Sequence, residues 1–384
     1  MLIIKKFLWG AALFCLLIIP LLTGFAFAAP ENSAGAAILV HAETGQLLYE
    51  KNASERMLIA STTKIMTALV VIENCELDAP VEVLPAHAAV IGSSMYLKPG
   101  GSYTVRDLLY GLLLASGNDA AEALATHCGG GIPEFAALMN EKAAALGMLN
   151  SCFKNPHGLD AEGHYSTAAD MAILTCAAMK NETFAKIVAT KTYTVGEQSY
   201  MNHNKLLWNY EGAIGVKTGY TIAAGRILVS CAERNGLRLI CVTISDPNDW
   251  EDHKALYDWG FGEYQYKPAI PEGRFCEVPL ISGEKNSVGV ACRGNTRMLL
   301  PKNCKLDLEI ELPEFVYAGV KAGERAGLLR LRAEGEIIGE YLLVYTEDAP
   351  LAEGVKLSPW GRFRRAWYLA NKYEFVFNGR PGAI

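Results

Sequence analysis

The chain has 384 residues, with 35 lysines and arginines, 41 aspartates and glutamates, and a formal net charge of −6. Proteins that bind nucleic acids usually carry a basic excess, so this composition argues against a nucleic-acid partner. The length is sufficient for one large domain and one smaller domain, each with its own hydrophobic core.

The first 28 residues have the pattern of a secretory signal peptide. Two lysines precede an apolar run from residue 7 to residue 22, and a small-residue Ala-Phe-Ala site ends at Ala28. This order predicts cleavage after residue 28 and export of the remaining chain. An uncleaved membrane anchor is the alternative interpretation, but the run is short for a membrane span and Pro20 interrupts it.

Ten cysteines occur in the chain, and nine of them lie beyond the predicted signal peptide. An odd number leaves at least one thiol unpaired in a monomer. Four of the nine lie in apolar stretches, and we interpret them as buried free thiols: Cys75, Cys128, Cys176 and Cys231. Export alone does not establish disulfides, so the state of these thiols stays open at this point.

Strand patterns occur at both ends of the region 29–265, and helical patterns lie between them. Residues 36–52 are typical of a hairpin that turns at Glu43-Thr44-Gly45. Apolar periodicity and stop signals predict helices over the ranges 62–73, 133–146 and 167–180, and two more within 104–131 that are broken at Ser116-Gly117.

Three β-branched stretches follow, separated by turn signals, and a closing helix is expected after them. The stretches are 212–221, 225–236 and 237–246, and the helix is expected at 250–260. The whole pattern predicts an α/β (α+β) domain over residues 29–265. Its antiparallel sheet would be built from both ends of the region, flanked by helices, with a helical subdomain inserted.

Pro268 and Pro271 mark a boundary after this region. Residues 268–350 contain short apolar runs and many glycines without a strong helical period, which predicts a small all-β domain.

A cationic, amphipathic helix is expected within the last segment, 355–384. One face gathers the apolar side chains Leu357, Trp360, Phe363, Trp367 and Tyr368, and the other the basic side chains Arg362, Arg365 and Lys372. Such a helix can lie in a membrane interface. The alternative is a helix that packs on its own domain.

The spacing Ser-x-x-Lys occurs three times, beginning at Ser61, Ser151 and Ser282. Only Ser61 opens a helix with an apolar stripe. Residues i and i+3 share a helix face, so the hydroxyl of Ser61 can meet the amine of Lys64. The positive potential of the helix N-terminus, together with burial, would lower the lysine pKa so that a neutral amine takes the serine proton. A helix N-cap followed by a solvated lysine is the alternative.

Two further motifs occur only once each. Ser116-Gly117-Asn118 interrupts two helical segments, where a hydroxyl and an amide can point into a cleft; an ordinary helix cap is the alternative. Lys217-Thr218-Gly219 lies on a predicted strand, so Lys217 and Gly219 share one face. Glycine there would let the backbone of a ligand run close alongside, and a strand end with a turn is the alternative.

These three motifs, in this order, resemble those of low-molecular-mass penicillin-binding proteins that act as serine-type D-alanyl-D-alanine carboxypeptidases. Gly117 stands where the motif has an aspartate. The resemblance spans essentially the whole mature chain and includes the segments GSSMYLKPG, NPHGLDAEGHYST and GVKTGYT. It implies an exported hydrolase, attached to the outer face of the cytoplasmic membrane, that removes the terminal D-alanine from peptidoglycan stem pentapeptides. β-Lactams would be its covalent inhibitors.

The resemblance also implies how an acyl-enzyme would form. Ser61 would attack the carbonyl carbon of the penultimate D-alanine, with Lys64 as its base. The backbone N–H groups of Ser61 and Tyr220 would form the oxyanion hole. Relatives often carry histidine where this chain has Tyr220, and a backbone role survives that change.

The remaining motif residues would relay protons and bind substrate. Ser116 would act in catalysis by relaying protons, and Asn118 would hold the peptide. Lys217 and Thr218 would bind the terminal carboxylate, which suits the point charge of an ammonium group, with Gly219 on the same strand.

Other chemistries find little support in the sequence. A zinc peptidase would need a ligand motif such as His-Glu-x-x-His, and a Ser-His-Asp hydrolase would typically contain Gly-x-Ser-x-Gly. The chain has neither motif. We therefore expect no metal or other cofactor. His157 and His164 are interpreted as structural, and Asp170 as a helix cap or anchor.

Two alternative functions remain. One is a β-lactamase, which would supply a water-activating glutamate in a Glu-x-x-x-Asn segment; no glutamate between Asn118 and Lys217 has asparagine four residues on. The other is a catalytically silent wall-binding protein on the same fold.

Overall fold

The computed structural model describes residues 29–378, apart from 269, 271–272, 294–296 and 357. It divides into two compact units whose boundary falls between Gln265 and Tyr266. The predicted signal peptide lies outside the described residues. Within the described part of the chain, no helix is both long and apolar enough to cross a membrane.

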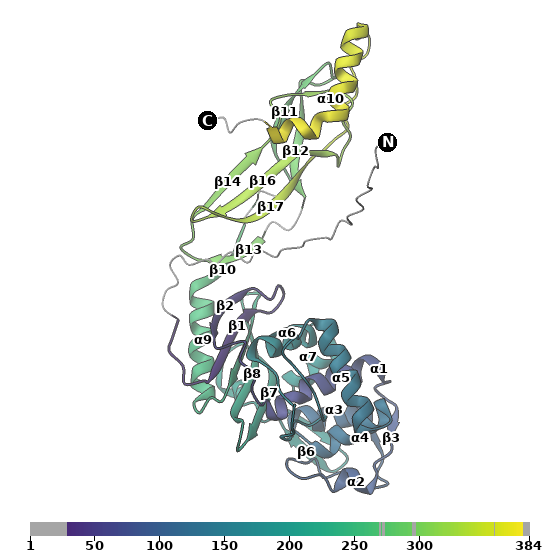
Figure 1. Ribbon diagram of the computed structural model, residues 1–384, viewed down its shortest axis with the longest axis vertical. Coiled ribbons are helices and arrows are strands. Elements are labelled where there is room, and N and C mark those ends of the chain that lie inside the picture. Colours follow the sequence, from purple (N-terminus) through teal and green to yellow (C-terminus); the bar gives the residue numbers. More distant parts are fainter. Residues whose placement is uncertain (1–28, 269, 271–272, 294–296, 357, 379–384) are drawn as a thin grey trace, which may run out of the picture. The chain divides into compact units, whose positions relative to one another are not determined.

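A five-stranded antiparallel sheet forms the centre of the first unit, in the order β2-β1-β9-β8-β7 (Figure 1). The strands are β1 (Ala36–His41), β2 (Leu47–Lys51), β7 (Ala213–Thr221), β8 (Gly225–Arg234) and β9 (Leu237–Ile244). β1 pairs with β9, which places Leu39 opposite Cys241. The two ends of the region therefore build one sheet, as the sequence predicts.

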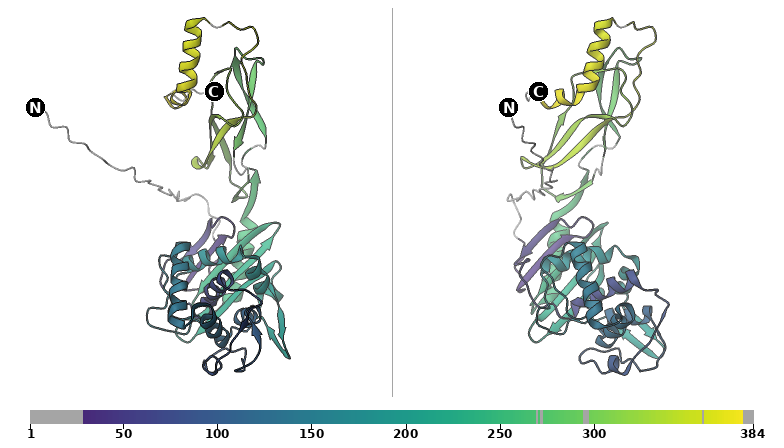
Figure 2. Two further views of the ribbon diagram at one scale, coloured as in Figure 1. Left: turned by 90° about the vertical axis from the view of Figure 1, so that its right-hand side faces the viewer. Right: turned by 45° about the vertical axis from the view of Figure 1, so that its right-hand side comes forward.

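Helices cover both faces of this sheet (Figure 1, Figure 2). The covering helices include α6 (Ala168–Met179) and α9 (Asp249–Glu263), and the helical subdomain adds α1 (Lys64–Asn74), α3 (Val105–Leu114), α4 (Asn118–Gly129), α5 (Ile132–Leu146) and α7 (Glu182–Ala189). Short pieces complete the unit: the 3₁₀ turn η1 (Ala60–Thr63), α2 (Pro85–Ala88), α8 (Leu206–Asn209), β3 (Pro80–Val81), β4 (Tyr103–Thr104), β5 (Thr192–Val195) and β6 (Gln198–Met201).

Side-chain caps explain where several helices begin. The hydroxyl of Thr104 accepts the N–H of Asp107 at 3.2 Å at the start of α3, and Thr167 accepts the N–H of Asp170 at 3.0 Å at the start of α6. Helix α1 differs, because neither it nor η1 has a side-chain cap. It begins at Lys64 rather than at Thr62.

The second unit is built on a six-stranded sheet in the order β14-β16-β17-β12-β11-β15. The strands are β11 (Arg274–Ile281), β12 (Ser287–Arg293), β14 (Leu306–Glu311), β15 (Val316–Tyr317), β16 (Arg325–Ala333) and β17 (Glu336–Tyr345), and β10 (Tyr264–Pro268) pairs with β13 (Arg297–Pro301). The α+β first unit and this β-rich second unit confirm the predicted fold class.

Helix α10 (Pro359–Asn378) ends the described chain and contacts its own unit. Arg365 donates to the carbonyl oxygen of Ala318 at 2.8 Å, and the Tyr368 hydroxyl donates to that of Phe315 at 2.9 Å. The prediction that these two residues lie on opposite faces is therefore wrong. Among the α10 side chains that the structure describes, the exposed aromatic ones are Trp360, Phe363 and Trp367, at 67%, 58% and 50%.

Candidate active site

A buried lysine joins three separate segments of the first unit. The Nζ atom of Lys64 lies 2.9 Å from Oγ of Ser61, 2.7 Å from Oδ1 of Asn118 and 2.8 Å from the carbonyl oxygen of His157. Ser61 lies in η1 and Lys64 opens α1, so one turn of helix brings hydroxyl and amine together. The interpretation of Ser61 as an N-cap is wrong, because its side chain caps neither helical segment.

The three contacts determine where a neutral amine would direct its lone pair. The oxygens of Asn118 and His157 can only accept hydrogen bonds, whereas a serine hydroxyl can also donate. A neutral Lys64 therefore directs its two N–H groups to those acceptors and its lone pair to Ser61. In that state the amine can accept the serine proton.

The environment of Lys64 favours this neutral state. Burial holds the pKa of Lys64 well below its usual value, the charge of Lys217 lowers it further, and Asp119 acts in the opposite direction. The expected lowering is thus present, but its main cause is burial. The second cause is the positive charge of Lys217, whereas from the sequence we expected the positive electrostatic potential of the helix N-terminus to contribute.

The break between α3 and α4 supplies Asn118 and Ser116. Asn118 Nδ2 donates to the carbonyl oxygen of Ile91 at 2.7 Å, and its N–H donates to that of Ser93 at 2.7 Å. Ser116 is 4% exposed and has a φ of 61°, in the left-handed region. Among the described contacts, its hydroxyl has none with Lys64, so the structure joins Asn118 directly to the lysine and places Ser116 beside this contact in the chain.

Asp119 is a residue of the site that sequence reasoning missed. Its carboxylate accepts the N–H groups of Met95 and Leu97, both at 3.0 Å, and the hydroxyl of Ser94 at 2.7 Å. It thereby fixes the loop that precedes β4 against the start of α4. The available signal was an aspartate in the first turn of a helix, next to a motif residue.

The loop that carries His157 packs closely under Ser61. Gly158 has a φ of 84°, and a Cβ placed on it would lie 1.8 Å from the carbonyl oxygen of Ala60. Thr67 of α1 donates to the carbonyl oxygen of Pro156 at 2.6 Å. Only glycine at 158 allows this approach, and the approach brings the carbonyl group of His157 to Lys64.

Strand β7 forms another wall of the site. Lys217 and Gly219 are buried on one face, Thr218 is partly buried, and Tyr220 is 64% exposed. A Cβ on Gly219 would lie 3.2 Å from the backbone nitrogens of Ser61 and Thr62. This glycine lets β7 approach the turn that carries Ser61, and the expectation that it also makes room for a ligand backbone stays a prediction.

Lys217 is a second buried amine. Burial lowers its pKa to about 7, and its Nζ donates to the carbonyl oxygen of Thr218 at 2.9 Å. Burial, and then the charge of Lys217, lower the pKa of His203. No motif in the sequence pointed to His203.

The histidines of the 154–164 segment are held as neutral structural groups. His164 Nδ1 accepts the N–H of Lys154 at 3.1 Å, so Nε2 carries the proton and donates to the Thr63 hydroxyl at 2.9 Å. Burial lowers the pKa of His157 to about 3 and that of His164 to about 4. Asp170 accepts the N–H of Asn150 at 2.8 Å and anchors that loop.

The other two Ser-x-x-Lys spacings form no comparable pair. The hydroxyl of Ser151 donates to Asp170 at 2.7 Å, and Lys285 pairs with Glu347. Neither lysine has a described contact with its serine.

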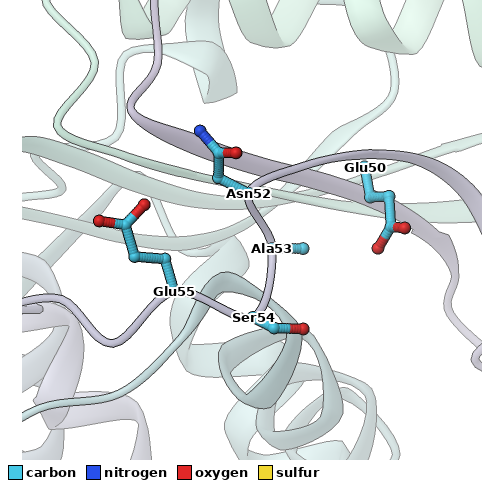
Figure 3. Close-up of a pocket in the computed structure, with 5 residues that line it drawn as sticks. All are labelled: Glu50, Asn52, Ala53, Ser54 and Glu55. Atoms are coloured by element: carbon cyan, nitrogen blue, oxygen red, sulfur yellow. The ribbon is translucent and has the colours of Figure 1, made fainter.

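A surface depression lies at the end of β2 and the loop that follows, and no motif residue lines it (Figure 3). Its lining residues are Glu50, Asn52, Ala53, Ser54 and Glu55. The carboxylates of Glu50 and Glu55 point to opposite sides of the loop, so they form no shared cation site (Figure 3). No group of three or more metal-ligating side chains occurs among the described residues.

A serine whose proton a buried amine can accept places this site in the class of serine hydrolases. Residues 23–248 match the family described as D-alanyl-D-alanine carboxypeptidase, peptidase S11. The chain belongs to this family of serine-type carboxypeptidases.

Relatives match over most of their length. The D-alanyl-D-alanine carboxypeptidase DacF of Bacillus subtilis is 32% identical, with 87% of this chain and 91% of the relative covered. DacC of Escherichia coli is 34% identical, with 88% of each chain covered. The structure of penicillin binding protein 5 from Haemophilus influenzae is similar with a TM-score of 0.71 and 29% identity, covering 85% of this chain and 100% of that one.

Proposed function

We propose that the protein is an exported D-alanyl-D-alanine carboxypeptidase that works through an acyl-enzyme on Ser61. The observation that carries this proposal is the set of three contacts at Lys64, because it leaves the lone pair of a neutral amine facing Ser61. The substrate is a peptidoglycan stem pentapeptide, in keeping with the activity named for the relatives.

Acylation begins when Lys64 takes the proton of Ser61 and Oγ bonds to the carbonyl carbon of the penultimate D-alanine. The backbone N–H groups of Ser61 and Tyr220 stabilise the oxyanion, and the contact of β7 with the Ser61 turn at Gly219 supports this assignment. The C–N bond then breaks, and the proton that Lys64 took from Ser61 passes through Ser116 to the leaving D-alanine.

Substrate binding uses the groups around this centre. The second N–H of Asn118 Nδ2 is available to a peptide carbonyl, since the first goes to Ile91. Lys217 and Thr218 bind the terminal carboxylate. Charge pairing with this carboxylate raises the pKa of Lys217 above its value in the free enzyme, so the bound lysine is protonated.

Penicillin acylates the same serine, and the fate of its ester separates the proposal from a β-lactamase. A lactamase would need a glutamate that activates water. Glu122 follows Asn118 most closely, but its carboxylate lies 3.4 Å from Nε2 of His157. We therefore expect a penicilloyl-Ser61 ester that persists for minutes or longer, whereas water releases the smaller natural acyl group.

Export follows from the signal pattern of residues 1–28, and attachment to a membrane surface follows from α10. Trp360, Phe363 and Trp367 expose large aromatic area on this helix. Co-sedimentation of the mature protein with anionic phospholipid vesicles tests the attachment. Replacement of all three aromatics by serine should abolish it, and undiminished co-sedimentation would remove α10 as the anchor.

The activity is tested on the purified protein of residues 29–384. It should release D-alanine from a D-alanyl-D-alanine peptide and gain one penicilloyl group that peptide mapping places on Ser61. Folded Ser61→Ala should do neither. A wild-type protein without release or adduct would favour the silent wall-binding alternative, and rapid penicillin turnover without an accumulating adduct would favour a lactamase.

A further inference from the structure

Two half-buried thiols lie in contact at the far end of the helices that form the site. Cys75 caps the C-terminus of α1, and Cys128 lies in the last turn of α4. The two thiols are hydrogen-bonded to each other. Both pack against the hydrophobic core from its edge, and neither is fully enclosed.

Helix geometry explains why these two thiols meet. The starts of α1 and α4 are joined by the 2.7 Å contact between Lys64 and Asn118, and the helices pack against each other (Figure 1). Eleven residues lead from Lys64 to Cys75 and ten from Asn118 to Cys128. At about 1.5 Å per residue both paths are about 15 Å long, so the second pair meets one helix length from the first.

We propose that Cys75 and Cys128 form a disulfide that fastens α1 to α4 when the protein meets an oxidising disulfide. The sequence-based interpretation of both as buried free thiols is replaced by this proposal. The bond would close a ring with the Lys64–Asn118 contact at one end and the disulfide at the other. That ring includes the helix of the nucleophile's base and the helix of the second motif.

The reaction balances as a thiol–disulfide exchange. The Cys75 thiolate attacks one sulfur of oxidised glutathione and releases one glutathione thiolate, which leaves a mixed disulfide. Cys128 then loses its proton to solvent, attacks the Cys75 sulfur and releases the second glutathione. Two protein thiols are oxidised by two electrons, and one small disulfide is reduced to two thiols.

The environment of Cys128 sets the order of these steps. Burial and the hydrogen bond that the Cys128 thiol donates to Cys75 raise the pKa of Cys128 to about 12, so its thiolate is scarce. The first attack therefore comes from Cys75. Its conversion to a mixed disulfide removes the possibility of a second negative charge beside Cys128 and lets the ring close.

The other described cysteines provide the comparison. Burial raises the pKa of Cys176 to about 11, and Cys231 and Cys241 are fully buried. Cys152 is half-buried and serves as a matched control because it is exposed to a similar degree without a thiol hydrogen-bonded to it.

Intact-mass measurement of residues 29–384 with oxidised glutathione, followed by non-reducing peptide mapping, tests the proposal. We expect loss of two hydrogen atoms and one linked peptide pair containing Cys75 and Cys128. Cys75→Ser should keep both hydrogens, and Cys152→Ser should lose them as the wild type does. Persistent glutathione adducts at these positions, or a link between another pair, would overturn the assignment. The wild-type map decides even where a variant fails to fold.

The effect of the Cys75–Cys128 disulfide on stability is measured as a shift in the midpoint of thermal unfolding. The oxidised wild type should unfold at a Tm about 5 to 10 °C above the dithiothreitol-reduced protein, because the bond closes a long loop in the unfolded chain. Cys75→Ser should show the same Tm in both conditions. An oxidised, linked protein with an unchanged Tm would refute the fastening of α1 to α4.

Discussion

The first unit contains two serine–base pairs in which the base is buried, and only one of them lies among the motif residues. Ser61 Oγ lies 2.9 Å from Nζ of Lys64, whereas Ser230 Oγ lies 2.6 Å from Nδ1 of His253. The second pair is the shorter one and uses the side chain most often associated with serine activation. It occurs between β8 and α9, within the core.

The difference lies in what else each base and serine contacts. Nε2 of His253 is 2.9 Å from the Thr243 hydroxyl, and Ser230 also meets the Tyr257 hydroxyl at 2.7 Å. Burial lowers the pKa of His253 to about 3, and Ser230 is 0% exposed. Ser61 is partly exposed, whereas Ser230 is closed off from solvent. Access for a substrate, rather than the distance to a base, therefore distinguishes the candidate nucleophile from the structural serine.

Replacing the base of each serine–base pair should give the largest difference between the two pairs. In Lys64→Ala the rate of acylation by a fluorescent penicillin should fall by about a hundred- to ten-thousand-fold, because the general base is lost. His253→Gln should acylate near the wild-type rate. Stopped-flow fluorescence measures both, with circular dichroism as the check on folding. Wild-type acylation by Lys64→Ala would refute the assigned base.

Two glycines with the same φ test whether the close approach at Gly158 supports the Ser61–Lys64 pair. Gly158 and Gly130 both have a φ of 84°, but a Cβ at 130 would meet nothing within 4 Å. Gly130→Ala should cost about 1 kcal/mol of unfolding free energy from the left-handed conformation alone. Gly158→Ala should cost clearly more and slow acylation, since the His157 carbonyl must withdraw from Lys64. Urea unfolding and penicillin labelling measure this, and equal losses would show that the close approach at Gly158 has no energetic role.

The Ser230–His253 pair should affect how the free energy of unfolding depends on pH in acid. Burial lowers the pKa of His253 from 6.5 to about 3 in the folded protein. Below pH 6.5 the unfolded chain therefore binds a proton at this histidine, whereas the folded chain does not. Stability that is complete above pH 6.5 is therefore lost as pH falls towards 3. Between pH 6.5 and 5 this loss is on the order of 1 to 2 kcal/mol. It should be smaller in His253→Gln, and identical urea-midpoint shifts in both proteins would contradict the prediction.

The smallest expected effect concerns the second lysine of the site. With a pKa of about 7, free Lys217 loses its charge as pH rises above 7. The KM for a peptide with a free terminal carboxylate should therefore rise roughly fivefold from pH 7 to pH 8. Lys217→Arg should have a flat KM over this interval, because a guanidinium stays charged. A KM that rises equally in both proteins would assign the titration to another group.

Most of the fold and the motif residues could be predicted from local patterns in the sequence. The strands at both ends of the region, the break at Ser116-Gly117 and the pairing of Ser61 with Lys64 all depend on spacing or on turn chemistry. Each of these is expressed within a few residues. They could therefore be predicted from the sequence.

The contacts that complete the site could not be predicted in this way. The carbonyl group of His157 lies 93 positions from Lys64 in the chain, and a backbone oxygen leaves no mark on residue identity. Gly219 was recognised as a position of close approach, but its partner, the Ser61 turn, becomes known only from tertiary packing. The two faces of α10 were misassigned because periodicity does not reveal which side chains meet the neighbouring strands.

The pairing of β1 with β9 has a consequence for the time at which the enzyme becomes active. All three motifs have been synthesised by residue 219, but β9 lies between β1 and β8 and ends only at Ile244. Until those residues have left the ribosome, β1 has no partner on that side, and the sheet that carries Lys217 stays incomplete. Long-range pairing of this kind forms late. We therefore expect a nascent or truncated chain that ends between residues 220 and 236 to contain every motif and to lack activity.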